Sequence, residues 1–371
     1  MIARVIMVLT VLFAGMLSGG CSMTVERTTI EDLAMIGVLG IDYVDGHNVK
    51  VTISYPQPSE GNKGLSETQS AESQFVEEGV IKLSSASDRS LSTAQVRVVL
   101  FGEELARKQG VMPQVKHLYR DPTIGDSVLF AIVRGSAEEM MKHEYGNKPE
   151  FSTYMNNLLH PRQVTAFSPF MTLHRFVFTA TDQVSDPMMP IVKLEEDTVK
   201  ITGVALFKGD KMIGELSDEE ARLGEAVREK QDLPNMKLYL GDRRGKTGNH
   251  VILQFVHTNE SVRSSGLPDS PHLHIKLKLR ANLMEYSGSE DLEKPEELEK
   301  LEARVSRALR RDVLLLLEKL QKLGIDPLSL GESIRSKTRG AWSKEHWEAL
   351  LAKTSFDAEV RTQIVNYGVL K

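Results

Sequence analysis

The chain has 371 residues, of which 41% are hydrophobic and 26% are charged, as in an ordinary globular protein. Its formal net charge of −5 gives no overall basic surface, so we expect no nucleic-acid partner. One cysteine, Cys21, excludes a disulfide framework. The length exceeds that of one ordinary core and predicts two or three domains.

The beginning of the chain has the three parts of an export signal. A basic residue, Arg4, precedes an apolar run from Val5 to Met16, and small residues then lead to Cys21. A bilayer core requires about 20 apolar residues, and this run is shorter. It therefore predicts a signal peptide over residues 1–20 that is removed on export.

Cys21 follows two glycines, as in lipoprotein signals whose cysteine is acylated before cleavage. We expect diacylglyceryl and N-acyl lipid on Cys21, holding the exported chain at a membrane surface. Ser18 stands where such signals usually carry leucine, so the efficiency of acylation has to be measured. The alternative is a plain secretory peptide followed by an ordinary cysteine.

Strand and helix patterns alternate in the first half of the mature chain. Residues 36–55 predict a β-hairpin around an Asp45-Gly46 turn, and the polar stretch 57–73 predicts a surface loop. The next expected elements are a strand at 96–101, helices at 103–108 and 111–119, a strand at 126–133, a helix at 136–143 and a proline-interrupted, largely helical stretch at 156–183.

The second half predicts an antiparallel sheet with one covering helix. A hairpin at 199–216 leads to the Ser217–Glu220 capping box of a helix. Apolar residues alternate with basic ones over 273–283, and leucines spaced by three and four mark a helix over 296–323. The remaining elements expected are strands at 237–240 and 250–257, a short helix at 342–353 and a last strand at 358–369.

Together these patterns predict an α+β fold with several subdomains, in which mixed or antiparallel sheets are each covered by helices. We expect an N-terminal α/β region over residues 21–197, made of one or two subdomains. A C-terminal α+β domain should follow over residues 198–371 and contain the long helix.

The chain carries no recognisable motif for catalysis, metal binding or cofactor binding. Residues 241–247 resemble a phosphate-binding loop, but three residues stand where four are needed and a strand follows, which favours a basic hairpin tip. Close strand packing explains Gly37 and Gly40 better than a dinucleotide site. His272 and His274 lie beside lysines without further ligands, which favours a solvated face over zinc. We therefore expect no catalytic residue, metal, cofactor or enzyme activity.

Two basic stretches, 276–280 on the predicted strand and 304–311 on the long helix, allow two interpretations. They could contact anionic lipid or a partner, or they could be ordinary solvated charges. The sequence pattern favours the second interpretation, because charged residues usually form the solvated side of such elements.

Short motifs follow one another along almost the whole mature chain. After Cys21 they are Glu31–Asp42, Phe101–Arg107, Tyr119–Pro122, Gly203–Lys208, Gly214–Leu216, Trp347 and Ile364–Gly368. Each motif is mostly apolar residues and glycine, so their order and spacing carry the weight. Together with the lipoprotein start, they resemble the Ger(x)C family, the lipoprotein C subunits of bacterial spore germinant receptors.

The resemblance implies a non-enzymatic subunit of a nutrient germinant receptor that is required for spore germination. It implies an anchor on the outer face of the cell membrane, which is the spore inner membrane, beside the integral-membrane A and B subunits. We do not expect this chain itself to bind a small molecule. The alternative is an extracytoplasmic solute-binding lipoprotein of a transporter, a class that usually has two similar α/β lobes around a cleft.

Overall fold

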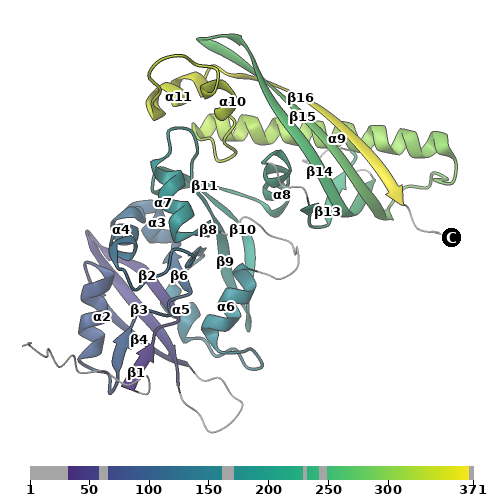
Figure 1. Cartoon of the computed structure of the whole chain (residues 1–371). Coiled ribbons are helices and arrows are strands. Elements are labelled where there is room, and N and C mark those ends of the chain that lie inside the picture. Colours follow the sequence, from purple (N-terminus) through teal and green to yellow (C-terminus); the bar gives the residue numbers. More distant parts are fainter. Residues whose placement is uncertain (1–31, 58–65, 161–170, 229–231, 242–248, 367–371) are drawn as a thin grey trace, which may run out of the picture. The chain divides into compact units, whose positions relative to one another are not determined.

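The computed structural model describes residues 32–57, 66–160, 171–228, 232–241 and 249–366 (Figure 1). Residues 34–371 form one compact unit, which contains all but the first two described residues. The expected signal peptide, Cys21 and nearly all of the 241–247 motif lie outside the described residues.

The first half of the chain builds a mixed sheet with the strand order β11-β10-β9-β7-β6-β2-β3-β4, and β8 also pairs with β7. Strands β2, β6, β7 and β9 run parallel, whereas the outer pairs are antiparallel. A short strand, β1 (Leu33–Met35), pairs with β5 (Ser90–Ser92). The strands of the large sheet are β2 (Val38–Asp45), β3 (Asn48–Pro56), β4 (Ser66–Ser73), β6 (Val98–Gly102), β7 (Leu129–Val133), β8 (Met171–Thr172), β9 (Met188–Glu195), β10 (Thr198–Lys208) and β11 (Lys211–Leu216).

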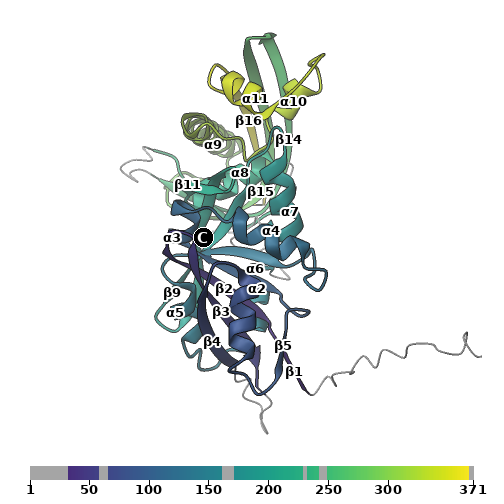
Figure 2. The same cartoon turned by 90° about the vertical axis from the view of Figure 1, so that its left-hand side faces the viewer.

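Helices cover both faces of this sheet, because its central parallel strands are apolar on both sides. One face carries an aromatic core in which Phe101 packs edge-on against Phe130, with ring centres 5.1 Å apart. Figure 2 shows α2, α4 and α7 together on this side. The helices of this face are α2 (Val76–Ser84), α3 (Glu103–Lys108), α4 (Met112–Arg120) and α7 (Leu173–Thr181), and those of the other are α5 (Ala137–Lys142) and α6 (Phe151–Leu159).

The second half builds a sheet with the order β12-β14-β15-β16, and β13 also pairs with β14. Helix α9 (Pro295–Leu323) contacts β13 and β16 and runs along this sheet (Figure 1). The apolar residues predicted at alternate positions from Leu273 to Leu283 are all buried beneath it. The remaining elements are α8 (Asp218–Val227), β12 (Asp232–Leu233), β13 (Met236–Tyr239), β14 (His250–Leu267), β15 (Ser270–Tyr286), α10 (Glu332–Arg335), α11 (Lys344–Leu351) and β16 (Ser355–Asn366).

Strand β10 contributes to two cores, because successive strand residues face opposite sides. Ala205 and Phe207 belong to the aromatic core of the first sheet, whereas Val204 and Leu206 belong to the core beneath α9. The expected domain boundary at 197/198 falls in the turn between β9 and β10, which pair with each other in the first sheet.

Most of the predicted elements are confirmed. Both hairpins form, the Ser217–Glu220 capping box is present at the start of α8, and α9 ends at Gly324 with a left-handed φ of 66°. The fold is α+β, with mixed sheets covered by helices, as the sequence predicts.

Two expectations about secondary structure are wrong, and a third differs in its bounds. Residues 66–73 form β4 and pair with β3, because backbone hydrogen bonds hold an edge strand whose polar side chains resemble those of a loop. Strand β16 runs parallel to β15, so the second sheet is mixed, and the crossover through α9 permits this return. The expected stretch at 156–183 is helical over most of its described residues, but α6 begins earlier, at Phe151, and α7 begins at Leu173.

Candidate functional site

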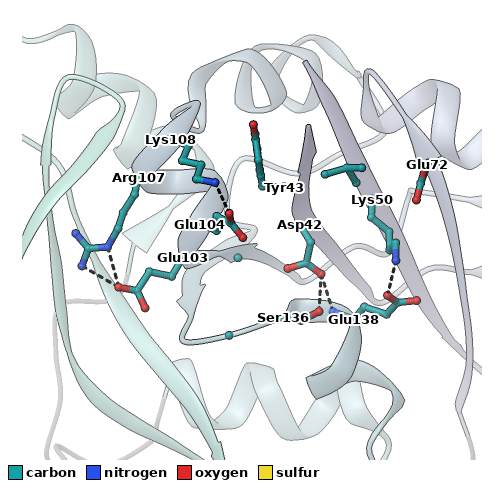
Figure 3. Close-up of a pocket in the computed structure, with 13 residues that line it drawn as sticks. Asp42, Tyr43, Lys50, Glu72, Glu103, Glu104, Arg107, Lys108, Ser136 and Glu138 are labelled. Carbon is teal, nitrogen blue, oxygen red and sulfur yellow. Dashed lines mark hydrogen bonds and ion pairs between the residues drawn. The ribbon is translucent and has the colours of Figure 1, made fainter. Parts of the chain in front are cut away.

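The parallel strands β2, β6 and β7 end at one edge of the first sheet, where ligands of open α/β sheets usually bind. This edge contains an open hollow of about 720 Å³ (Figure 3). Its lining residues come from β2, β3, β4, the end of β6, α3 and the first turn of α5 with the residues just before it. It is therefore the natural place to look for a functional site.

Asp42 lies at the centre of the hydrogen-bond network in this hollow (Figure 3). Its carboxylate accepts hydrogen bonds from Ser136 Oγ at 3.0 Å and from the backbone N–H groups of Ala137 at 2.8 Å and Glu138 at 2.9 Å. Burial raises the pKa of Asp42, and these three hydrogen bonds oppose the rise. Asp42 thus satisfies the free N–H groups at the start of α5, which is the task of a helix cap.

Gly102, at the end of β6, lies directly against Asp42. A Cβ atom at position 102 would overlap Asp42 Oδ1. The motifs Glu31–Asp42 and Phe101–Arg107, which are far apart in sequence, therefore meet at this point. Both motifs contribute to a close packing contact between strands β2 and β6 and the start of helix α5.

Most of the charged side chains around Asp42 are paired with one another. Burial on its own would raise the pKa of Glu138, but hydrogen bonds from Lys142, Ser70 and Lys50 lower it to about 2. A charged ligand would have to displace such pairs. They are Lys50–Glu138 at 3.1 Å, Lys142–Glu138 at 2.7 Å, Arg107–Glu103 at 2.8 Å and Lys108–Glu104 at 2.5 Å.

Ser136 is the one hydroxyl group in the hollow that contacts a carboxylate in Figure 3. Its O–H group donates to Asp42, and its oxygen accepts from the N–H of Glu139 at 3.3 Å, so Ser136 satisfies groups at the start of α5. Neither histidine nor cysteine occurs among the described residues that line the hollow. A serine nucleophile needs an adjacent base, and the arrangement supplies a structural joint instead.

Gly37 and Gly40 are explained by close packing, although the partners are helices rather than strands. A Cβ at Gly40 would lie 2.6 Å from Met141 Sδ on α5, and one at Gly37 would lie 2.5 Å from Ser152 Cβ on α6. Glycine at these positions lets both helices approach β2 closely.

A second polar cluster is buried where the segment before β9 contacts the segments that follow α9. We call Asp186, Asp326 and Lys344 the junction cluster. Lys344 Nζ lies 3.0 Å from Asp186 Oδ1 and donates to the carbonyl groups of Val184 and Ser185, each at 2.8 Å.

Asp326 is only 1% exposed, and its carboxylate accepts from the N–H groups of Leu330 at 2.9 Å and Gly331 at 2.8 Å. Asp186 Oδ2 accepts from the N–H of Asp326 at 2.7 Å. Burial raises the pKa of both carboxyl groups, that of Asp326 to about 6. The cluster therefore joins distant segments by a buried charge network that depends on one lysine.

The two histidines considered for zinc bond different residues of β16. His272 Nδ1 lies 2.8 Å from Ser355 Oγ, and His274 Nδ1 lies 2.9 Å from Asp357 Oδ2. In the described part of the chain, no three His, Cys, Asp or Glu side chains are placed to hold a metal ion. Among these described residues, no helix is both long and apolar enough to span a membrane.

Sequence reasoning missed a set of side chains on α9 that bond the outer edge of β16. Ser306 Oγ accepts from Thr362 N at 2.9 Å, and Glu302 Oε1 accepts from Ile364 N at 2.7 Å. Arg310 Nε completes the row by donating to the Ala358 carbonyl group at 2.7 Å.

These three residues recur every four positions, and that spacing of polar residues along one helix face was the available signal. Their bonds occupy backbone groups that could otherwise pair with another strand. Part of the basic stretch 304–311 is thereby explained, since Arg310 bonds β16 and Arg304 bonds Glu290 at 2.7 Å.

Comparison of this chain with known protein families and structures indicates its class. The chain matches a spore germination protein N-terminal domain over residues 26–194 and a spore germination B3/GerAC-like C-terminal domain over residues 202–368. A germinant-receptor type of α+β subunit is thus indicated across both halves.

Individual relatives agree with this class. The spore germination protein GerQC of Bacillus cereus is 22% identical over 352 residues, covering 94% of this chain and 95% of the relative. Spore germination protein B3 of Bacillus subtilis (strain 168) is 23% identical, covering 92% and 93%. The crystal structure of the GerBC protein is similar in fold, with a TM-score of 0.57 and 20% identity, covering 88% of this chain and 97% of that one. The chain belongs to the Ger(x)C family of spore germination proteins.

Proposed function

We propose that this chain acts as the lipid-anchored C subunit of a nutrient germinant receptor. Membership of the family makes it a germinant receptor subunit in spore germination. The observation that carries the proposal is the pair of family matches over 26–194 and 202–368, which begins five residues after a lipoprotein-like Cys21. The transporter alternative is not favoured by these matches.

The proposed anchor has a simple physical role. Each buried CH₂ group contributes about 0.8 kcal/mol, so a single acyl chain binds reversibly whereas a diacylglyceryl group with an N-acyl chain holds firmly. An anchor on Cys21 would keep the folded body, residues 34–371, beside the membrane-embedded A and B subunits. Tethering raises the local concentration for weak contacts with these partners. Under this proposal the chain contributes assembly rather than chemistry.

Labelling with radioactive palmitate tests the anchor directly. We expect the wild-type chain to incorporate label and Cys21→Ala to incorporate none. Ser18→Leu is the matched variant, because it restores the usual leucine three places before the cysteine and should raise the labelled fraction. Equal labelling of wild type and Cys21→Ala would refute the anchor, whatever the result for Ser18→Leu.

Germination of spores tests the role in the receptor. Spores whose only copy carries Cys21→Ala should lose most of their response to the nutrient, while circular dichroism of the purified chain stays unchanged. Copurification from detergent-solubilised spore membranes should recover the A and B subunits with the wild-type chain. A response to nutrient that survives deletion of this chain would contradict the proposal. Strong, saturable thermal stabilisation by one amino acid or sugar would instead support direct ligand binding.

A further inference from the structure

The solvent-facing side of the second sheet carries three cationic side chains, Lys278, Arg280 and Arg361, over two adjacent rows of its strand ladder. Lys278 of β15 stands between Asn259 of β14 and Arg361 of β16. In the next row, Arg280 stands between Gln363 and His257, and His257 Nδ1 lies 3.2 Å from Asp232 Oδ1 of β12. We call these two rows the cationic rows. Lys278 and Arg280 have no ion pair with any residue in the described part of the chain.

The neighbouring rows of the same strands show how such charges are usually balanced. Lys276 lies 3.4 Å from Glu359, and His274 lies 2.9 Å from Asp357. Like charges opposite each other destabilise a sheet, and Lys278 faces Arg361 directly, although Arg361 Nε also pairs with Glu359 Oε1 at 2.7 Å. Lys278 and Arg280 have no such ion pair among the described residues although the formal net charge of the protein is −5, so a general excess of basic residues does not account for them.

Large apolar side chains are exposed at the same end of the sheet. Met284 is 55% exposed and follows Arg280 on the same side of β15, while Val365 is 54% exposed and follows Gln363 on β16. Phe255 is 72% exposed in the β14 bulge, with a left-handed φ of 52°. An exposed aromatic residue in this backbone conformation is costly, since bulky residues rarely adopt it.

We propose that the cationic rows, with Phe255, Met284 and Val365, dock onto the headgroups of an anionic phospholipid bilayer. Arginine and lysine suit lipid phosphate, and apolar side chains scattered among cations suit the boundary between headgroups and acyl chains. Such a surface needs no shaped pocket. The inference rests on the proposed membrane location, and it assigns one face of the C-terminal region to the lipid. It replaces the interpretation of Lys278 and Arg280 as ordinary solvated charges.

Vesicle binding tests the docking face without the lipid anchor. The protein is the mature chain, residues 21–371, carrying Cys21→Ser. The vesicles contain phosphatidylglycerol and phosphatidylcholine in equal parts, or phosphatidylcholine alone. We expect sedimentation with the anionic vesicles only, and release as sodium chloride is raised, because exposed charges are screened by salt.

Two triple variants separate local from overall charge. Lys278→Gln/Arg280→Gln/Arg361→Gln should bind anionic vesicles about a hundredfold more weakly, since each surface cation contributes about fivefold. The control, Lys82→Gln/Lys193→Gln/Lys200→Gln, removes the same charge from exposed ion pairs of the first half and should bind as the wild type does. Phe255→Ser/Met284→Ser should weaken binding and leave the salt dependence in place. Circular dichroism confirms that each variant is folded.

Several outcomes would overturn the proposal. These are no binding to anionic vesicles, equal binding to neutral ones, or equal weakening by the two triple variants. If the triple variant of Lys278, Arg280 and Arg361 fails to fold, two other measurements still test the proposal. They are the salt titration of the wild type and the binding of the Phe255→Ser/Met284→Ser variant. The face would be assigned to a protein partner instead if the wild type does not bind vesicles and the triple variant of Lys278, Arg280 and Arg361 no longer copurifies with the A and B subunits. Palmitate labelling of Cys21 is unaffected by any of these results, so failure of the docking face is distinguishable from failure of the anchor.

Discussion

Replacement of Lys344 by methionine should destabilise the contact between the two halves of the chain by about 3 kcal/mol. The ammonium group is the cation of the junction cluster and also bonds the carbonyl groups of Val184 and Ser185. Breaking a buried ion pair by removal of one partner costs about 3–5 kcal/mol. We take the lower end, because the Lys344 side chain is 23% exposed and water can partly replace it.

The loss should depend on pH in a defined direction. Burial holds the folded-state pKa of Asp326 at about 6, above its ordinary 3.8, so stability from this group falls as pH rises through that interval. Without the lysine, both carboxyl pKa values should rise further, because only like charge remains beside each group. The difference between wild type and Lys344→Met should therefore be larger at pH 8 than at pH 5.

Urea unfolding followed by tryptophan fluorescence measures this effect. The chain has two tryptophans, and both lie near the cluster: Trp342 Nε1 donates to the Gln183 carbonyl group at 3.2 Å, and Trp347 is 1% exposed. Lys208→Met is the matched control, since Lys208 lies 2.8 Å from Glu348 in an exposed pair worth about 0–1 kcal/mol. Equal losses for the two variants, or a Lys344→Met loss that is the same at both pH values, would refute the reasoning.

Three further predictions concern the edge of β16 and the hollow at Asp42. Ser306→Ala leaves the N–H of Thr362 without its acceptor and should cost about 1–3 kcal/mol, with self-association detected by light scattering; the exposed Ser84→Ala serves as control. Gly102→Ala places a methyl group against Asp42 Oδ1 and should lower the free energy of unfolding by about 1–3 kcal/mol. Gly135→Ala is the control for backbone strain alone, because Gly135 has open space for a Cβ atom and a φ of 106°. The pKa of Glu138 is lowered to about 2, so its contribution to stability is present above about pH 4.5 and is lost as pH falls toward 2. In Glu138→Gln, stability should therefore fall less steeply on the acid side of the pH profile. An unchanged acid transition would contradict the pKa argument.

The elements that the sequence predicted correctly are those whose signal is local. The β2–β3 hairpin has its Asp45-Gly46 turn between two apolar runs, and α9 has both a leucine periodicity and a glycine stop. The capping box at Ser217 lies within four residues of chain. In each case the residues that determine the structure are neighbours in sequence.

The features that were missed depend on partners far along the chain. Asp42 caps a helix that begins at Ala137, and Ser306 bonds a strand 56 residues further on. Strand β4 has polar side chains and is held by the backbone of β3, so its composition resembles that of a loop. The pattern of side chains along one element indicates which of its faces is buried, but it does not indicate which other element packs against that face. The candidate hollow was therefore not predicted, although its motifs were singled out.

Strand β10 shows that division of the sequence into two domains need not coincide with division of the cores. Phe207 lies 5.8 Å from Phe176 in the aromatic core, so a fragment that ends at residue 197 loses a ring from that core. Loss of one buried phenylalanine side chain costs about 3–5 kcal/mol. We predict that fragment 32–197 will not fold, whereas fragment 32–216, which keeps β10 and β11, will unfold cooperatively in urea.

The longer fragment should carry a penalty of its own. Val204 and Leu206 face the core beneath α9, and removal of the second sheet exposes them. Fragment 32–216 should therefore self-associate in sedimentation experiments, and Val204→Thr/Leu206→Thr should reduce that association without unfolding it, because these side chains no longer have a core to fill. If fragment 32–197 unfolds cooperatively with the same free energy of unfolding as fragment 32–216, β10 contributes its stability to the C-terminal region. The opposite result would mean that the N-terminal region needs the β10–β11 hairpin, and that the hairpin couples the two halves of this subunit through its two faces.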